Sequence, residues 1–366
     1  MVLPQTASAR KVFIVDALAR RPNGAQRRAP NSNGQAATAR SAGAGAPYGA
    51  LDLGTNNCRL LIARPGLHGL HVVDAYSRIV RLGEGLGLSG TLGEAAMDRT
   101  IEALRVCSNK LKWHEVGAQR LIATEACRQA VNGPDFIQRV RDEVGLELEI
   151  IDRATEANLA AAGASPLIED GAKSAVIFDI GGGSTEVMWM EQGEAGYQIK
   201  AWVSLAAGVV TLSERHNGGR EVTPTSFAAM RAEVKRLLVP LVAEVATFSD
   251  VNTTPSHLLG TSGTVTTIVG VHMGLRHYDR GKVDGAWLAN EAAGEVTRRL
   301  LAMTYEQRVA NGCIGRERAD LVLAGCAILE EIRLAFPAPR IRVADRGLRE
   351  GILIQLMQAD RVWSNR

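Results

Sequence analysis

Two short glycine-containing segments have the residues needed to bind phosphate. They are DLGTNN at 52–57 and DIGGGST at 179–185, and each begins with an aspartate at the end of an apolar stretch. Glycines leave backbone N–H groups open to phosphate oxygens because no Cβ is in the way. Asp52 and Asp179 could hold a divalent ion against the same oxygens. The pair of segments therefore predicts a phosphate-binding cleft between two similar lobes.

Neither loop matches the commonest nucleotide-binding motifs. The patterns G-x-x-x-x-G-K-[ST] and G-x-G-x-x-G are both absent from them, so the sequence disfavours a P-loop nucleotidase and a Rossmann dinucleotide site. The residues expected to face phosphate are Gly54, Thr55, Asn56, Asn57, Gly181, Gly182, Gly183, Ser184 and Thr185.

Similar runs of strands and helices must position the two loops. In the first run, β-type segments at 48–54, 57–64 and 70–80 are joined by short turns, which predicts an antiparallel meander. The segments expected after it are a helix at 93–116, a strand leading into a helix at 120–126, a helix at 135–144, a strand at 146–152 and a helix from 155.

The second run starts in the same way. Its expected strands are at 175–180, 184–190 and 197–205, and its later segments are a helix at 226–247, a strand and glycine turn at 257–264, helices at 264–272 and 318–335, a strand at 341–345 and a helix at 347–357. The predicted fold is therefore α/β with two lobes, residues 48–173 and 174–366.

Composition agrees with two compact units. The chain has 366 residues, of which 46% are hydrophobic and 38 are glycine, as in α/β proteins with many tight turns. Five widely spaced cysteines indicate neither a zinc site nor a disulfide framework, which favours a reducing cytoplasm. No apolar run reaches the about 18 residues needed to span a bilayer. We therefore expect a cytoplasmic protein without a membrane partner.

The positive charge is concentrated in residues 1–47. This segment carries a net charge of +6, whereas the rest of the chain carries −3, so the body is not a basic nucleic-acid binder. The segment is rich in Ala, Gly, Asn and Arg, which predicts a disordered tail.

Seven segments carry a family resemblance. The chain resembles the exopolyphosphatase / guanosine pentaphosphate phosphohydrolase (Ppx/GppA) family in its short, two-domain form, and this family belongs to the actin-like ATPase superfamily with its ribonuclease H-like lobes. The segments, in chain order, are LDLGTNNCRLLIA, RLGEGL, ATEACRQAVNG, IIDRATEANLAAAG, VIFDIGGGSTEV, LLGTSGT and DRGLREGIL.

The resemblance implies roles for individual residues. Glu156 falls where the family has the catalytic base that activates water, and Arg128 matches an arginine that meets the phosphate chain. Asp179 and Glu186 resemble the metal-binding carboxylates, and Asp52 shares a second ion or holds it through water. Without the resemblance, Glu156 would be interpreted as a carboxylate that stabilises a helix N-terminus, Glu186 as an ordinary strand residue and Arg128 as a solvated helix charge.

One residue departs from the family pattern. The family commonly has an arginine two residues after the catalytic glutamate, whereas this chain has Asn158. We expect the lost charge to weaken phosphate binding or to alter the preferred chain length.

The implied activity is an exopolyphosphatase that uses Mg²⁺ or Mn²⁺ to release terminal orthophosphate from inorganic polyphosphate. The alternatives are a guanosine pentaphosphate 5'-phosphohydrolase in alarmone metabolism (the stringent response), a kinase of the same superfamily, and a non-catalytic polyphosphate or alarmone sensor. Polyphosphate is favoured because no residues are evidently committed to a guanine edge. The resemblance is also compatible with a homodimer.

Overall fold

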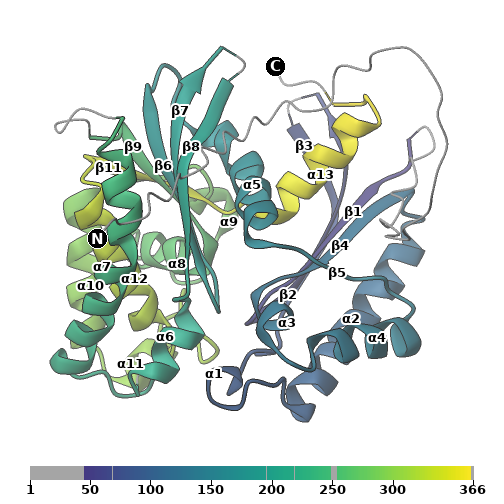
Figure 1. Cartoon of the computed structure of the whole chain (residues 1–366), viewed down its shortest axis with the longest axis horizontal. Helices are drawn as coiled ribbons and strands as arrows, with labels where there is room; N and C mark the ends of the chain where they lie inside the picture. The colour runs from purple at the N-terminus through teal and green to yellow at the C-terminus, as the bar shows by residue number, and fades with distance from the viewer. Residues whose placement is uncertain (1–44, 68, 195, 218, 249–253, 364–366) are drawn as a thin grey trace, which may run out of the picture.

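The computed structural model describes residues 45–67, 69–194, 196–217, 219–248 and 254–363. Figure 1 shows two lobes side by side, each built around a twisted sheet with helices packed against it. The mixed α/β architecture with two lobes confirms the predicted fold class. The predicted basic tail lies outside the described residues up to position 44. Every described helix is too short or too polar to cross a lipid bilayer.

The sheet of the first lobe has five strands in the order β3-β2-β1-β4-β5. They are β1 (Tyr48–Leu53), β2 (Asn57–Gly66), β3 (Gly69–Ile79), β4 (Ala118–Ala123) and β5 (Glu149–Ile150). The first three pair antiparallel, as the meander predicts, and β4 pairs parallel with β1. The turn between β1 and β2 is the first glycine loop.

Helices cover one face of this sheet and enclose the core of the first lobe. They are α1 (Leu86–Ser89), α2 (Glu94–Trp113), α3 (Glu125–Gln129) and α4 (Gly133–Val144). Ile101 and Leu104 of α2 and Phe136 of α4 are buried against strand residues such as Leu51 and Leu60. This packing fixes the sheet that carries the first loop.

The second lobe has a six-stranded sheet in the order β10-β11-β9-β6-β7-β8. Its strands are β6 (Ser174–Ile180), β7 (Thr185–Gly193), β8 (Gly196–Leu205), β9 (His257–Thr261), β10 (Trp287–Ala289) and β11 (Arg340–Ala344). Strands β6, β7 and β8 form an antiparallel meander like that of the first lobe, and β9 pairs parallel with β6. The second glycine loop is the turn between β6 and β7.

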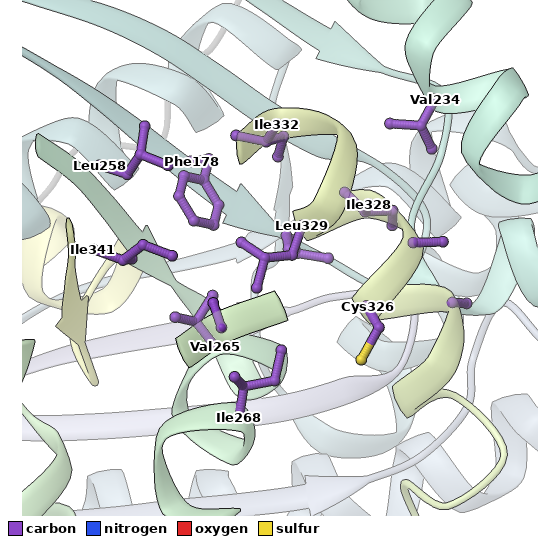
Figure 2. Close-up of a cluster of buried hydrophobic side chains, with 14 of the residues drawn as sticks. Phe178, Val234, Leu258, Val265, Ile268, Cys326, Ile328, Leu329, Ile332 and Ile341 are labelled. Atoms are coloured by element: carbon purple, nitrogen blue, oxygen red, sulfur yellow. The ribbon is translucent and has the colours of Figure 1, made fainter. Parts of the chain in front are cut away.

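Most helices of the second lobe pack on one face of its sheet (Figure 1). They are α6 (Val209–Arg215), α7 (Pro224–Val245), α8 (Ser262–His272), α9 (Arg280–Val283), α10 (Asn290–Ala302), α11 (Tyr305–Ala310) and α12 (Val322–Ala335). Figure 2 shows the centre of this core, where Phe178 and Leu258 from the strands face Val265 of α8 and Leu329 of α12.

Two helices lie between the sheets: α5 (Arg153–Ala164), which continues into a 3-10 turn at Ser165–Leu167, and α13 (Leu348–Ala359). Helix α5 buries alanines against β6 and β7 of the second lobe. Helix α13 buries Ile352 and Leu353 against β1 and β2 of the first lobe, although its sequence lies at the end of the predicted second lobe, 174–366. The last helix therefore returns to the first lobe, and the α5–α13 pair joins the two halves.

Candidate active site

A cavity of about 120 Å³ lies between the lobes, at the ends of both meanders. The predicted site residues that line it are Asp52, Gly54, Thr55, Asn56, Asn57, Glu156, Asp179, Gly181, Gly182, Gly183, Ser184 and Glu186. Segments from both halves of the chain therefore meet at one place. The first turn of α8 also contributes, through Ser262, Gly263 and Thr264.

The two glycine loops touch each other. A Cβ on Gly183 would lie 2.5 Å from Oγ1 of Thr55, and a Cβ on Gly182 would lie 3.1 Å from Cβ of Asn56. Gly208 has no room for a side chain either, since a Cβ there would lie 2.3 Å from the carbonyl of Gly182. These glycines are thus required for contact between the lobes as well as for access to backbone N–H groups.

Glu156 lies in the first turn of α5. The helix begins after Asp152, whose carboxylate accepts a hydrogen bond from the backbone N–H of Thr155, and this cap fixes where the first turn starts. The Glu156 side chain is 12% exposed, and its Oε2 accepts a hydrogen bond from Nη2 of Arg128 at 3.0 Å. Burial and, next, the negative charge of Glu186 raise the pKa of Glu156, while Arg128 opposes the rise.

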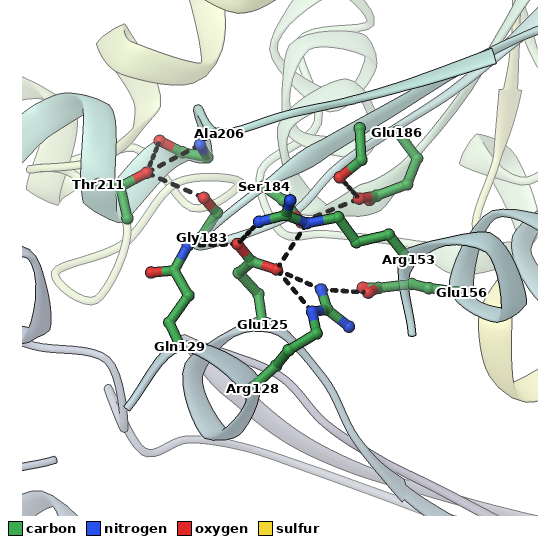
Figure 3. Close-up of polar contacts among 12 residues, drawn as sticks. Glu125, Arg128, Gln129, Arg153, Glu156, Gly183, Ser184, Glu186, Ala206 and Thr211 are labelled. Atoms are coloured by element: carbon green, nitrogen blue, oxygen red, sulfur yellow. Dashed lines mark hydrogen bonds and ion pairs between the residues drawn. The ribbon is translucent and has the colours of Figure 1, made fainter. Parts of the chain in front are cut away.

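Glu125 connects two arginines beside this glutamate (Figure 3). Its buried carboxylate accepts hydrogen bonds from Nε of Arg128 at 3.0 Å and from Nη2 of Arg153 at 2.7 Å, as well as from the Gln129 amide. Arg128 also donates to the carbonyl of Ile151 at 2.6 Å. Arg128 is thereby held against Glu156 by fixed partners. Sequence reasoning did not identify Glu125 as the anchor of both arginines.

The carboxylates of the second lobe come from adjacent strands. Asp179 on β6 pairs directly with Glu186 on β7. Oε1 of Glu186 accepts hydrogen bonds from Ser184 Oγ at 2.9 Å and Ser204 Oγ at 2.8 Å. Burial and then the charge of Asp179 raise the pKa of Glu186 to about 7, and burial also raises the pKa of Asp179. These two side chains therefore hold negative charge at an energetic cost that a cation would relieve.

Asp52 is the carboxylate near the end of β1 in the first lobe. Burial raises its pKa to about 6, against the nearby positive charges of Arg59 and Arg349. Its cross-strand partner on β2 is Arg59, not a second carboxylate.

The donor set suits a divalent ion shared with substrate. Among the described residues, no three His, Cys, Asp or Glu side chains form a ready metal-binding group. Asp179 and Glu186 nevertheless supply the hard oxygen atoms that Mg²⁺ prefers, and Mg²⁺ commonly uses only one or two carboxylates together with water and substrate phosphates. An ion held partly by phosphate oxygens therefore fits these residues better than a closed protein cage.

Three residues that the sequence singled out do not line the cavity. Thr185 is fully buried and its hydroxyl donates to the carbonyl of Ala207 at 2.6 Å, so it does not line the cavity. Arg128 does not line the cavity either and is occupied by its two glutamates. Asn158 donates to the carbonyl of Ala154, one turn earlier in its own helix.

The cavity also contains cations that sequence reasoning missed. Arg59 and Arg318 line it, and Arg318 donates to Oγ1 of Thr267 at 3.2 Å. Arg59 had a detectable signal, because it follows Asp52 by seven residues, as Glu186 follows Asp179. Arg318 had none, since it lies in a polar segment before a helix.

Comparison with known proteins gives consistent matches. The model of the Ppx/GppA phosphatase family matches residues 61–360. Exopolyphosphatase 2 of Mycobacterium tuberculosis is 31% identical over 324 residues, which cover 84% of this chain and 97% of that protein. The crystal structure of an exopolyphosphatase from Cytophaga hutchinsonii aligns with a TM-score of 0.77 at 26% identity, over 87% of this chain and 99% of the other. The Aquifex aeolicus member of the Ppx/GppA family aligns over the same shares, with a TM-score of 0.70 at 25% identity.

Proposed function

Because the chain belongs to the Ppx/GppA phosphatase family, and is therefore a phosphoanhydride hydrolase, we propose that it releases terminal orthophosphate from inorganic polyphosphate by attack of a water molecule that Glu156 activates. The observation that carries the proposal is the position of Glu156, which lines the cavity where both glycine loops meet. The first step of the proposed reaction is binding of the terminal phosphoryl group between the two glycine loops.

Hydrolysis then needs a base beside the attacking water. The water oxygen bonds to the terminal phosphorus, the bond from phosphorus to the bridging oxygen breaks, and the water proton passes to Glu156. Burial supports this role because a raised pKa makes the carboxylate a stronger base near neutral pH. Arg128 supports it by holding Glu156 in one orientation.

Charge on the phosphoryl oxygens must also be compensated. We expect backbone N–H groups of the two glycine loops and the hydroxyl of Thr55, a residue that lines the cavity, to serve this purpose, whereas the Ser184 hydroxyl is used by Glu186. A divalent ion, Mg²⁺ or Mn²⁺, would be held by Asp179 and Glu186, with Asp52 nearby, and would supply further positive charge to the phosphate oxygens when bound.

The lining favours polyphosphate over guanosine pentaphosphate. It consists of glycines, hydroxyl-bearing and charged side chains and a few aliphatic residues, and no aromatic side chain is among the described lining residues. A guanine base would thus find no aromatic surface to stack on, whereas a chain of phosphates can use hydroxyl, N–H and guanidinium donors along its length.

A comparison of kcat/KM for long-chain polyphosphate and for guanosine pentaphosphate tests this choice. Both values are measured at one metal concentration and one ionic strength, because salt screens highly charged substrates. We expect the polyphosphate value to be the higher. A value for guanosine pentaphosphate that equals or exceeds it would assign the enzyme to the alarmone instead.

A further inference from the structure

The first glycine loop is supported from outside by the segment at residues 80–83. The carbonyl of Asn56 accepts hydrogen bonds from two backbone N–H groups of this segment, including that of Arg81 at 3.1 Å, and the carbonyl of Thr55 accepts one from Gly83 at 2.9 Å. A Cβ on Gly83 would lie 2.3 Å from Cγ2 of Thr55, so the two stretches of chain are in close contact. Thr55 and Asn56 line the cavity. A shift of residues 80–83 would therefore shift part of the cavity wall.

The side chain of Arg81 reaches from this segment to the second lobe. Its Nη1 lies 2.9 Å from Oδ2 of Asp320, and its Nη2 donates to Oδ1 at 3.1 Å and to the carbonyl of Glu317 at 3.4 Å. A guanidinium that meets both oxygens of a carboxylate fixes its direction as well as its distance. Both side chains are partly buried, so salt screens this pair less than an exposed one.

Asp320 lies on the segment that also carries Arg318. Arg318 lines the cavity and donates to Oγ1 of Thr267 at 3.2 Å. Between the two, Ala319 is fully buried, and its carbonyl accepts a hydrogen bond at 3.1 Å from Nε of the buried Arg308. These contacts leave Arg318 and Asp320 little freedom to move separately. The ion pair therefore connects the first glycine loop with Arg318.

The ion pair itself lies outside the cavity, because neither Arg81 nor Asp320 is among the described residues that line it. Any effect of these two side chains on a bound phosphate must pass through the residues that they hold. A second contact between the lobes lies nearby, where Oε1 of Glu214 in α6 accepts a hydrogen bond from the backbone N–H of Gly85 at 3.0 Å. Figure 1 shows α1 and α6 meeting at the foot of the two lobes, away from α5 and α13.

We propose that Arg81 is a positioning residue for hydrolysis: its ion pair with Asp320 holds the first glycine loop and Arg318 at the separation at which both face one phosphoryl substrate. The inference rests on the proposed function for the identity of the substrate, whereas the link between the lobes exists without any substrate. When the pair is lost, the substrate must bring the loop and Arg318 together as it binds. The cost therefore falls on KM more than on kcat.

Hydrogen–deuterium exchange of the full chain without substrate tests the link. Arg81→Gln and Asp320→Asn should each speed exchange of the backbone amides at residues 52–57 and 80–85 at least about threefold, because their hydrogen bonds open more readily once the ion pair is lost. The charge-swapped double variant, Arg81→Asp with Asp320→Arg, should restore part of the protection. Aspartate suits position 81, where φ is +50°, because it tolerates the left-handed conformation.

Arg105→Gln is the matched control, because it breaks an ion pair of 2.8 Å with Glu143 that lies within the first lobe. It should leave both the amide exchange at residues 52–57 and the kinetics unchanged. The thermal transition of every variant is recorded to establish that it is folded.

Kinetics on polyphosphate separate this inference from the proposed function. Arg81→Gln should raise KM at least about threefold and lower kcat by less, and the charge-swapped double variant should restore part of the wild-type KM. Unchanged amide exchange or an unchanged KM in folded Arg81→Gln would overturn the inference, even if polyphosphate is hydrolysed. Faster amide exchange that the charge swap reverses, in a protein that does not hydrolyse polyphosphate, would support the link between the lobes and contradict the proposed function.

Discussion

Glu156 experiences opposing influences from its neighbours: Arg128 stabilises its charge, whereas burial and Glu186 disfavour it. If this carboxylate accepts the proton of the attacking water, Glu156→Gln should lower kcat on polyphosphate by at least about 100-fold, the usual contribution of a general base. The amide has the same shape, so the melting temperature should stay close to that of the wild type.

Glu149→Gln is the control for this substitution, because Glu149 is an exposed glutamate of β5 that pairs with Arg120. It should retain wild-type turnover. A wild-type rate in Glu156→Gln would mean that another group activates the water.

Asp179 and Glu186 permit a prediction about the ion. Asp179→Asn and Glu186→Gln should each raise the Mg²⁺ concentration needed for half-maximal activity, because each removes a charged oxygen ligand. Asp170→Asn changes an exposed carboxylate outside the cavity and should leave the titration unchanged. The same half-maximal concentration in all three variants would show that the ion is held elsewhere.

The sequence was sufficient to predict which loops line the cavity, since a repeated Asp–Gly pattern at strand ends has few structural outcomes. It was not sufficient for side-chain direction. Thr185 begins β7 and its hydroxyl is used by the Ala207 carbonyl, and Arg128 is used by Glu125 and Glu156. The contacts of Thr185 with Ala207 and of Arg128 with Glu156 join residues distant in sequence, which no local pattern encodes. The contact of Arg128 with Glu125 is different, since it is an i,i+3 pair within α3.

At the scale of elements, the crossing of α5 and α13 determines how the lobes are joined. A Cβ on Gly163 would lie 1.9 Å from the carbonyl oxygen of Gly347, and one on Gly351 would lie 2.0 Å from that of Leu159. Backbone atoms cannot move aside as a flexible side chain can, so the helices could approach this closely only with glycine at both positions.

Gly163→Ala should therefore destabilise the protein by about 1–3 kcal/mol, the usual cost of overpacking. Gly87→Ala is the control, because Gly87 is exposed and a Cβ there would come no closer than 3.9 Å to another residue. Denaturant unfolding measures both. Equal stability of Gly163→Ala and the wild type would contradict the close crossing.

Strand β9 gives a prediction about pH. His257 is fully buried with neither ring nitrogen hydrogen-bonded, and burial lowers its pKa from 6.5 to about 4. The unfolded chain binds a proton at this residue between these two values and the folded chain does not, so stability is lost as pH falls from about 6.5 towards 4.

His257→Phe should reduce this loss, since it removes the titrating group and keeps a ring beside Trp287. The melting temperature is measured from pH 7 to pH 4, with His71→Phe on the exposed part of β3 as the control. An identical pH dependence in wild type and His257→Phe would disprove the assignment.

Most elements could be predicted from hydrophobic periodicity and turn residues, because the meanders and the longer helices have clear patterns. Helices α1, α6, α9, α10 and α11 and strand β10 were not predicted. All of them except α10 have seven residues or fewer, and α10 buries only Ala293, Val296, Thr297 and Leu300 among its 13 residues. The contact of α13 with the first lobe was also missed, since position in the chain does not reveal which sheet a terminal helix joins.

At the scale of the whole molecule, the lobes meet on two sides of the cavity. On one side α5 and α13 pack between the sheets. On the other, Arg81 of the first lobe forms an ion pair with Asp320 of the second at 2.9 Å, and Glu214 accepts a hydrogen bond from the backbone N–H of Gly85. The cavity is therefore bounded by both halves of the chain.

This arrangement makes a direct prediction about where water attacks. In a single turnover of long-chain polyphosphate in ¹⁸O-labelled water with Mg²⁺, the released orthophosphate should carry one ¹⁸O atom and the shortened chain none, with no acceptor molecule present. Label in the shortened chain, release of short polyphosphate fragments instead of orthophosphate, or absence of turnover would contradict the account.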